Sequence, residues 1–574
     1  MRRTRRVGAA VALAAAVACA GSGCTVIPVS GPYTVSDTGG GDPLNKPFQR
    51  MIAVPPRDDW DPERLIQGLQ AAMAAYPDDP TVLARYLTPK AQAKWKASGP
   101  VTVIEDVYQV EPPGEGDEAE TYGLKGKQVA RIDPDDAYVP LSGNAPERLF
   151  VLKKDARGAY RVDDLPDGLL LTKSDVARAY RLTNLYYLNS ARERLVVDRV
   201  CLRLKPTETF AQTIVKRLLK GPSGALRGAV GTVFPEGTRV ESVGTGEDRV
   251  LINFSGPLLP LDLGEKAALV AQLKYSLTTN KVANSRTIEV QVDGEQYWTE
   301  PPNLEAHWLD NGGNTPYYTS KGSVHVMSNE GPGVAVSGPA GEGNTDFKAF
   351  ALSTQQTGAI VAARTSTGIS IAGLTPEGRW QQVVEGADLT DPTWRRDGSL
   401  WTFDQHNKVV LRYDPNGGRG PERVSAPGLD GLDVTAFRIA RDGVRVALRT
   451  GKNTVQLGAL SEGLNGPMLG NLQTLTSTEV EYEIEDIAWE DDEHLLVLIK
   501  SKAGQILNEI DIGDGETIGI PLKDRLAGVT ALNGRVLAEA STEKGPKIIE
   551  LNQDRQGWTS KIEPNAKNPF FPLG

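Results

Sequence analysis

Residues 314–574 of this 574-residue chain carry a repeat that restricts the possible fold more than any other feature of the sequence. Each copy has an aromatic or apolar residue, a polar turn and then an apolar, strand-like run. The turns lie at intervals of 40, 45, 51 and 40 residues, at Gly358, Gly398, Gly443, His494 and Gly534. Short strands at such a period are typical of a β-propeller. We expect residues 314–574 to form a propeller of five or six blades.

Two further features belong to this repeat. Trp394 and Trp489 precede their turns at equivalent positions, which favours repeated core packing over a ligand site. The apolar tail Asn568-Pro569-Phe570-Phe571-Pro572 either closes the last blade or docks on a neighbouring domain.

The first 24 residues have the order of a bacterial export signal. Four arginines, at positions 2, 3, 5 and 6, precede Val7–Ala20, a run of 14 small or apolar residues. That run is too short to span a bilayer, which takes roughly 20 apolar residues. We therefore expect residues 1–23 to be a signal peptide.

Gly21-Ser22-Gly23-Cys24 resembles a bacterial lipobox. The resemblance implies that Cys24 becomes the new N-terminus, carrying an S-diacylglycerol and an N-palmitoyl group. Gly21 departs from the leucine usual at that position, and Cys19 is the alternative acceptor. An ordinary secreted protein with incidental cysteines is the remaining possibility.

Residues 24–47 are rich in Pro, Gly, Ser and Asp, which predicts a flexible tether with a reach of roughly 25–30 Å. Residues 48–204 predict an α+β domain, because three short helical patterns precede several strand-like runs. The first helix starts at Asp61-Pro62-Glu63 and the third at Thr88-Pro89. Residues 171–204 are expected to form a connecting hairpin.

Residues 205–305 show the order helix, strand, strand, helix, strand, which predicts a small layered α/β domain. The second helix begins with a capping box formed by Asp262 and Glu265. Four motifs of this region resemble the GerMN domain: Lys220-Gly221-Pro222, Pro235-Glu236-Gly237-Thr238, Ile252-Asn253-Phe254-Ser255 and Val292-Asp293-Gly294. The resemblance implies a binding or packing module rather than an enzyme.

Composition argues against nucleic acid as a partner. The chain has a net charge of −10, and loss of the signal peptide, with four arginines and no acid, lowers it to −14. We find no zinc, nucleophile or nucleotide motif and predict no cofactor, no metal site and no catalytic residue. Asp133–Asp136 and Asp491-Asp492 are interpreted as solvated turn acids, and Cys201 as a small buried hydrophobe.

The whole order resembles the LpqB family of actinobacterial lipoproteins: Cys24, then Ile27-Pro28 and Ser30-Gly31-Pro32, an α+β domain, a GerMN-like domain and a propeller. The resemblance implies a non-enzymatic accessory of the MtrA–MtrB two-component system. It would be lipid-anchored outside the cell membrane and act on the extracellular domain of the sensor kinase. The alternative is an envelope enzyme acting on glycans, or a ligand-binding protein, that uses the propeller.

Overall fold

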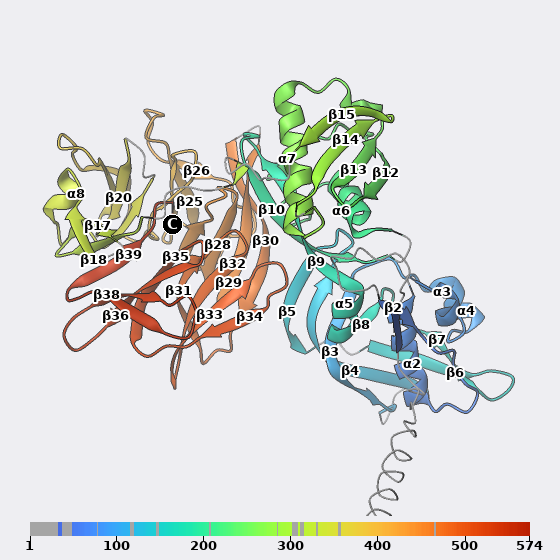
Figure 1. Ribbon diagram of the computed structural model, residues 1–574. Helices are drawn as coiled ribbons and strands as arrows, with labels where there is room; N and C mark the ends of the chain where they lie inside the picture. The colour runs from blue at the N-terminus through green and yellow to red at the C-terminus, as the bar shows by residue number, and fades with distance from the viewer. Residues whose placement is uncertain are drawn as a thin grey trace, which may run out of the picture.

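A computed structural model of the chain describes residues 33–36, 49–76, 78–114, 120–144, 148–205, 208–283, 285–300, 308–309, 315–328, 331–353, 358–463 and 466–573. The signal peptide, Cys19 and Cys24 lie outside these residues. Figure 1 shows three bodies that follow one another along the chain. They are a mixed domain in blue and cyan, a second domain mainly in green, and an all-β domain from yellow to red, so the expected fold class is confirmed.

The first domain contains three helices, and the starts of the first and the third were predicted from local sequence. Each helix has proline at its first position and a capping side chain just before it, at Asp61, Asp79 and Thr88. Asp61, for example, accepts a hydrogen bond from the backbone N–H of Arg64 at 2.8 Å. The helices are α2 (Pro62–Ala75), α3 (Pro80–Ala84) and α4 (Pro89–Lys94).

These helices pack against a sheet with the order β7-β6-β4-β3-β8, in which β5 also pairs with β4. A short helix, α5 (Lys173–Ala179), follows the last strand. The strands are β3 (Val101–Glu111), β4 (Thr121–Ile132), β5 (Tyr138–Asn144), β6 (Arg148–Lys154), β7 (Tyr160–Asp164) and β8 (Leu170–Thr172).

One part of the predicted tether is not a tether. Strand β1 (Tyr33–Ser36) pairs antiparallel with β2 (Gln49–Ile52), so backbone hydrogen bonds hold this stretch to the first domain. The prediction that residues 24–47 are flexible throughout is therefore wrong for Tyr33–Ser36. The chain from Cys24 to Tyr33 spans nine residue steps, which cannot exceed about 30 Å when fully extended.

The second domain combines a hairpin with a four-stranded sheet. Strands β9 (Tyr180–Asn189) and β10 (Leu195–Arg203) form the hairpin, and the short β11 (Val230–Gly231) pairs with β9. Helix α7 crosses between the parallel strands β13 and β14, and its predicted capping box, Asp262 with Glu265, is confirmed. The remaining elements are α6 (Phe210–Leu219), β12 (Val240–Thr245), β13 (Arg249–Phe254), η1 (Gly256–Leu258), α7 (Leu263–Thr279), β14 (Thr287–Val292) and β15 (Glu295–Glu300).

The hairpin bridges two cores instead of only connecting two domains. At its base, Tyr180 and Cys201 belong to the core of the first domain. Its apolar residues from Leu185 to Leu202 pack with α6, α7 and the sheet of the second domain. The predicted boundary near residue 204 therefore cuts through the second core, and the physical boundary lies at the base of the hairpin.

The described residues of the third domain form a six-bladed propeller of four-stranded sheets. Blades one to three contain β39 (Ala566–Phe570), β16 (Tyr317–Ser320), β17 (Ser323–Ser328) and β18 (Gly331–Ala335); β19 (Ala349–Leu352), β20 (Ile360–Arg364), β21 (Gly368–Gly373) and β22 (Gln381–Glu385); and β23 (Thr393–Trp394), β24 (Leu400–Asp404), β25 (Val409–Tyr413) and β26 (Glu422–Val424). Blades four to six contain β27 (Val434–Ile439), β28 (Arg445–Thr450), β29 (Thr454–Gly463) and β30 (Gly466–Ser477); β31 (Glu483–Trp489), β32 (His494–Ser501), β33 (Gly504–Asp511) and β34 (Thr517–Ile520); and β35 (Arg525–Leu532), β36 (Arg535–Ser541), β37 (Lys547–Leu551) and β38 (Trp558–Ile562). A short helix, α8 (Pro339–Glu342), lies between blades one and two.

The ring closes through the C-terminal tail. Strand β39 pairs with β16, so the first blade combines strands from both ends of the domain. This explains why six blades show only five repeats in sequence: the predicted turns all join the first two strands of blades two to six. In blade one, the strand at that position comes from the C-terminus and no such turn exists.

The two tryptophans confirm the predicted core packing. Trp394 and Trp489 are both buried. Each indole N–H donates to a backbone carbonyl of the inner strand one blade earlier, Trp394 to Ala351 and Trp489 to Arg438, at 3.1 Å in both cases. They therefore hold neighbouring blades together, and Trp489 also borders the central cavity of the propeller.

Candidate functional site

One candidate site lies at the centre of the propeller. It is a cavity of about 280 Å³ lined by the inner strands of several blades. Charged side chains come from blades three to six; among them are Asp391 of blade three, Arg438 of blade four and Asp486 of blade five. Phe350, Gly528 and Phe570 belong to a less polar wall from blades two, six and one.

Asp391 is neutralised by two arginines. Its Oδ1 accepts from Nε of Arg364 at 2.7 Å and its Oδ2 from Nη2 of Arg438 at 3.3 Å. Burial favours the neutral carboxyl, but attraction to Arg438 and Arg364 prevails and holds the pKa of Asp391 below its ordinary value. Asp391 is therefore an ionised, structurally engaged carboxylate.

Asp486 has no such ion pair among the described residues. Each of its oxygens accepts one backbone N–H, from Ile487 and from Val529, both at 2.9 Å. Burial is the main cause of its raised pKa, and Arg438 counteracts this only in part. Gly528 makes room for this carboxylate, because a Cβ there would lie 3.2 Å from Oδ2 of Asp486.

The lining of the cavity has the carboxylates expected of a glycan-cleaving enzyme but not the tyrosine or histidine expected beside them. No tyrosine or histidine is among the described residues that line it. In the parts of the chain that the structure describes, no group of three or more His, Cys, Asp or Glu residues is placed to hold a metal ion. The charged part of the lining comprises two guanidinium groups and four carboxylates beside apolar surface: Arg438, Arg441, Asp391, Glu485, Asp486 and Glu539.

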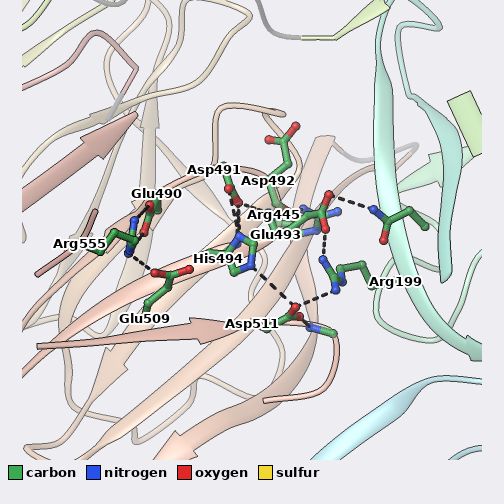
Figure 2. A network of polar contacts seen from close by, with 12 residues as sticks. Arg199, Arg445, Glu490, Asp491, Asp492, Glu493, His494, Glu509, Asp511 and Arg555 are labelled. Carbon is green, nitrogen blue, oxygen red and sulfur yellow. Dashed lines mark hydrogen bonds and ion pairs between the residues drawn. The ribbon is translucent and has the colours of Figure 1, made fainter. Parts of the chain in front are cut away.

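A second candidate is the junction between the second domain and the propeller, shown in Figure 2. Arg199 of β10 reaches into the propeller and forms ion pairs with Glu493 and with Asp511, the latter at 2.7 Å. Asn184, its neighbour across the hairpin, donates to Oε1 of Glu493 at 3.0 Å. Gly513 packs directly on Arg199, because a Cβ at residue 513 would lie 2.8 Å from the Cβ of Arg199.

Apolar packing and further hydrogen bonds extend this junction. Val444 and Ala459 of blade four belong to the same buried cluster as the second domain. Asn471 of β30 donates through Nδ2 to the carbonyl oxygen of Arg227 at 2.9 Å. The second domain and the propeller are thus joined by a continuous core with charged contacts beside it.

The acidic turn at Asp135 and Asp136 joins the first domain to the second. Asp136 accepts from Nε of Arg217 at 2.7 Å, and Asp135 accepts from the backbone N–H of Gly224 at 2.6 Å. Our interpretation of these residues as solvated turn acids is wrong. The turn lies at the edge of the first domain, and its short carboxylates accept hydrogen bonds from the neighbouring second domain.

His494 lies within the propeller side of the junction. Its Nδ1 is 3.0 Å from both carboxylate oxygens of Asp491, and its Nε2 is 3.8 Å from Asp511. The hydrogen bond with Asp491 is the main cause of a raised pKa, opposed by burial and supported by Asp511 and Glu509. Asp491 also caps the turn by accepting two backbone N–H groups, so it is not simply solvated either.

This arrangement predicts a pH dependence. Because the pKa of His494 is raised on folding, its stabilising effect is fully present below the ordinary histidine pKa of about 6.5 and is lost as the pH rises through the folded value. We expect the wild-type chain to unfold about 1–2 °C above His494→Gln at pH 6, with no difference at pH 9. Differential scanning fluorimetry across that range tests this, and a constant gap would contradict it.

Arg199 was not identified from the sequence as a contact residue, although two features of the sequence mark the junction. Asp198 and Arg199 interrupt an otherwise apolar strand, and His494 stands where the other turns have glycine. Both departures lie at the junction. Cys201, by contrast, behaves as predicted: it is buried, and burial raises the pKa of its thiol to about 12.

The second domain also exposes an apolar ridge, which we define as residues Leu259–Leu263. Leu259 is 59% exposed and Leu263 is 72% exposed, and Pro260 between them is exposed too. Helix α7 starts at this ridge and ends beside Asn184, where Asn280 caps it and hydrogen-bonds the hairpin. Its 17 residues span about 25 Å, so the ridge points away from the propeller junction.

Three family profiles match consecutive parts of the chain. The profile described as "Lipoprotein LpqB, N-terminal domain" matches residues 55–177, and "Lipoprotein LpqB beta-propeller domain" matches residues 323–572. Between them, the Germane profile, described as "Sporulation and spore germination", matches residues 184–297. The predicted GerMN-like domain is thereby confirmed, and the start of its match agrees with the hairpin belonging mainly to the second core.

Curated relatives extend over the same length. Lipoprotein LpqB of Thermobifida fusca is 26% identical and covers 99% of both chains, and that of Streptomyces coelicolor is 28% identical, covering 93% of this chain and 92% of the relative. Among solved structures, TolB from Acinetobacter baumannii is similar with a TM-score of 0.35 and 12% identity, over 58% of this chain and 82% of TolB. No helix in the described residues is long and apolar enough to cross a membrane. The chain belongs to the LpqB family of actinobacterial lipoproteins.

Proposed function

We propose that this lipoprotein is anchored through Cys24 on the extracytoplasmic face of the cell membrane and modulates a sensor histidine kinase there. The partner is the extracellular domain of an MtrB-like kinase in an MtrA–MtrB type two-component system. The proposal rests on family membership, on the lipobox-like sequence at Cys24 and on the surface of the second domain.

The apolar ridge is the observation that carries the protein-recognition part of this proposal. Exposed aliphatic side chains clustered on one loop are a common mark of a protein-binding surface. Leu259 and Leu263 flank Pro260, which restricts the loop and lowers the entropy lost on binding. Arg192 and Glu265 form an ion pair of 3.5 Å beside the ridge and supply a polar rim.

A weak contact at this ridge is sufficient if both partners share one membrane. Anchoring converts association into a two-dimensional encounter at high effective concentration. We expect a soluble chain without lipid to bind the kinase domain weakly, and the lipidated chain to change kinase output strongly.

The role is proposed as non-catalytic. Each carboxylate that lines the propeller cavity accepts hydrogen bonds from the protein: Asp391 from two arginines, Asp486 from two backbone N–H groups, Glu485 from Gln505 and Glu539 from the backbone N–H of Asn568. A general acid and base need free protons to exchange with a substrate. An envelope enzyme remains the alternative, and substrate turnover that depends on one cavity residue would favour it.

The ridge gives a direct test. In a strain lacking the native gene, the lipidated chain with Leu259→Ser and Leu263→Ser should restore less than a third of the kinase-dependent reporter output that the wild-type chain restores. Both side chains are exposed, so surface substitutions of this kind should change folding stability by no more than about 0.5 kcal/mol each.

The matched control is Val480→Ser on the propeller, since Val480 is 95% exposed and lies on a different domain. It should restore full output. If the ridge variant reaches the membrane in normal amount and restores full output, the ridge is not the contact surface. If even the wild-type chain changes no output, the signalling role itself fails.

A further inference from the structure

The lining of the propeller cavity includes a donor, Arg438, and an acceptor, Asp486, that both have unused hydrogen-bonding capacity. The Arg438 side chain makes one hydrogen bond to a described residue, from Nη2 to Asp391. The N–H groups on its Nε and Nη1 therefore remain available to a ligand. Each oxygen of Asp486 accepts a single backbone N–H, which leaves lone pairs on both. All three side chains line the same cavity.

These charges are costly where they are. A carboxylate taken out of water without a paired cation is destabilising, and a propeller needs no charge at its centre to fold. Desolvation is the main cause of the raised pKa of Asp486. Retaining such a group in the cavity is explained if a ligand supplies the missing cationic partner.

Another part of the lining is less polar. Phe350 comes from blade two, Phe570 from blade one and Val529 from blade six, and all three border the cavity. Pockets for small molecules combine a mainly apolar lining with a few convergent polar groups. With a volume of about 280 Å³, this cavity holds roughly nine waters or one small organic molecule.

We propose that the propeller cavity is a binding site for a small zwitterion of the α-amino acid class. The ligand's ammonium group donates to Asp486, its carboxylate accepts from the free edge of Arg438, and its side chain packs on the wall near Phe350 and Phe570. Asp391 positions Arg438 by holding its Nη2. This site is separate from the ridge on the second domain, so the result of its test does not depend on whether the ridge binds the kinase.

The experiment uses the full mature lipoprotein in detergent, dialysed free of small molecules, and isothermal titration calorimetry. Three probes share one apolar side chain: L-leucine is the zwitterion, L-leucinamide keeps only the cation and N-acetyl-L-leucine keeps only the anion. L-leucine should bind saturably, and each singly charged probe should bind at least tenfold more weakly. Absence of saturable L-leucine binding at millimolar concentration overturns the proposal.

Two variants test the location. Asp486→Asn should weaken L-leucine binding at least tenfold and bring it near that of N-acetyl-L-leucine, while Asp430→Asn, at an exposed carboxylate, should change nothing. If Asp486→Asn does not fold, Gly528→Ala serves instead, since its new Cβ crowds Oδ2 of Asp486. Undiminished binding in a folded cavity variant overturns the proposal.

Discussion

Replacing Cys24 by serine should move the whole protein out of the membrane fraction or leave it unprocessed. The serine hydroxyl does not take the diacylglycerol that the resemblance to a lipobox implies for the thiol. Each buried CH₂ of an acyl chain contributes about 0.8 kcal/mol to membrane binding, so losing the chains removes nearly all of the attachment. The net charge of −14 in the mature chain cannot replace it on an anionic surface.

The measurement is fractionation of cells followed by immunoblotting and mass analysis of the N-terminus. Cys19→Ser is the control at the neighbouring thiol, and it should stay in the membrane fraction, lipidated. If the Cys24→Ser chain is processed and still resists a salt wash in the membrane fraction, anchoring through Cys24 is wrong.

Anchoring also limits where the protein can act. Pairing of β1 with β2 holds Tyr33 on the first domain, so this domain stays within about 30 Å of a lipidated Cys24 along the chain. This value is an upper limit for the fully extended chain, whereas the roughly 25–30 Å inferred for residues 24–47 as a free tether is an average reach. An anchored chain therefore keeps its first domain near the membrane surface.

Local features of the fold could be predicted from the sequence. The helix starts at Asp61 and Asp262 depend on a capping side chain and on residues within one turn, so they can be recognised from adjacent residues in the sequence. The blade turns repeat because each joins two adjacent strands. Trp489 was placed correctly in the core because its position in the repeat matches that of Trp394.

Contacts between distant parts of the chain could not be predicted in this way. Strand β39 closes blade one by pairing with β16, almost 250 residues earlier, and the sequence offers only an apolar tail as a hint. The acidic turn at Asp135 and Asp136 looks like any solvated turn until Arg217 is placed beside it. The cavity charges are likewise dispersed over four blades and come together only when the ring forms.

Substituting Arg199 by alanine should loosen the joint between the second domain and the propeller. The change leaves Glu493 and Asp511 without their shared cation in a mostly buried site. Breaking one side of a buried ion pair typically costs about 3–5 kcal/mol, because the remaining charge is left unpaired. In the wild-type chain, burial raises the pKa of Asp511 and attraction to Arg199 opposes this rise. The pKa of Asp511 should therefore rise further in the variant.

The loosening can be followed by limited proteolysis and by small-angle scattering of the mature chain. Arg199→Ala should give faster cleavage between the domains and a larger radius of gyration, while circular dichroism stays that of folded domains. Arg192→Ala on the same hairpin is the matched control, since its ion pair with Glu265 is exposed and contributes roughly 0–1 kcal/mol.

A rescue variant separates lost charge pairing from lost packing. Adding Glu493→Gln and Asp511→Asn to Arg199→Ala removes the two orphaned charges, and isosteric neutral partners are far less costly to bury. We expect the triple variant to recover at least half of the lost resistance to proteolysis. If it recovers nothing, Arg199 holds the joint by packing against Gly513 and not by its charge. If Arg199→Ala itself cleaves and scatters like the wild-type chain, the apolar contact through Val444 and Ala459 holds the two domains without it.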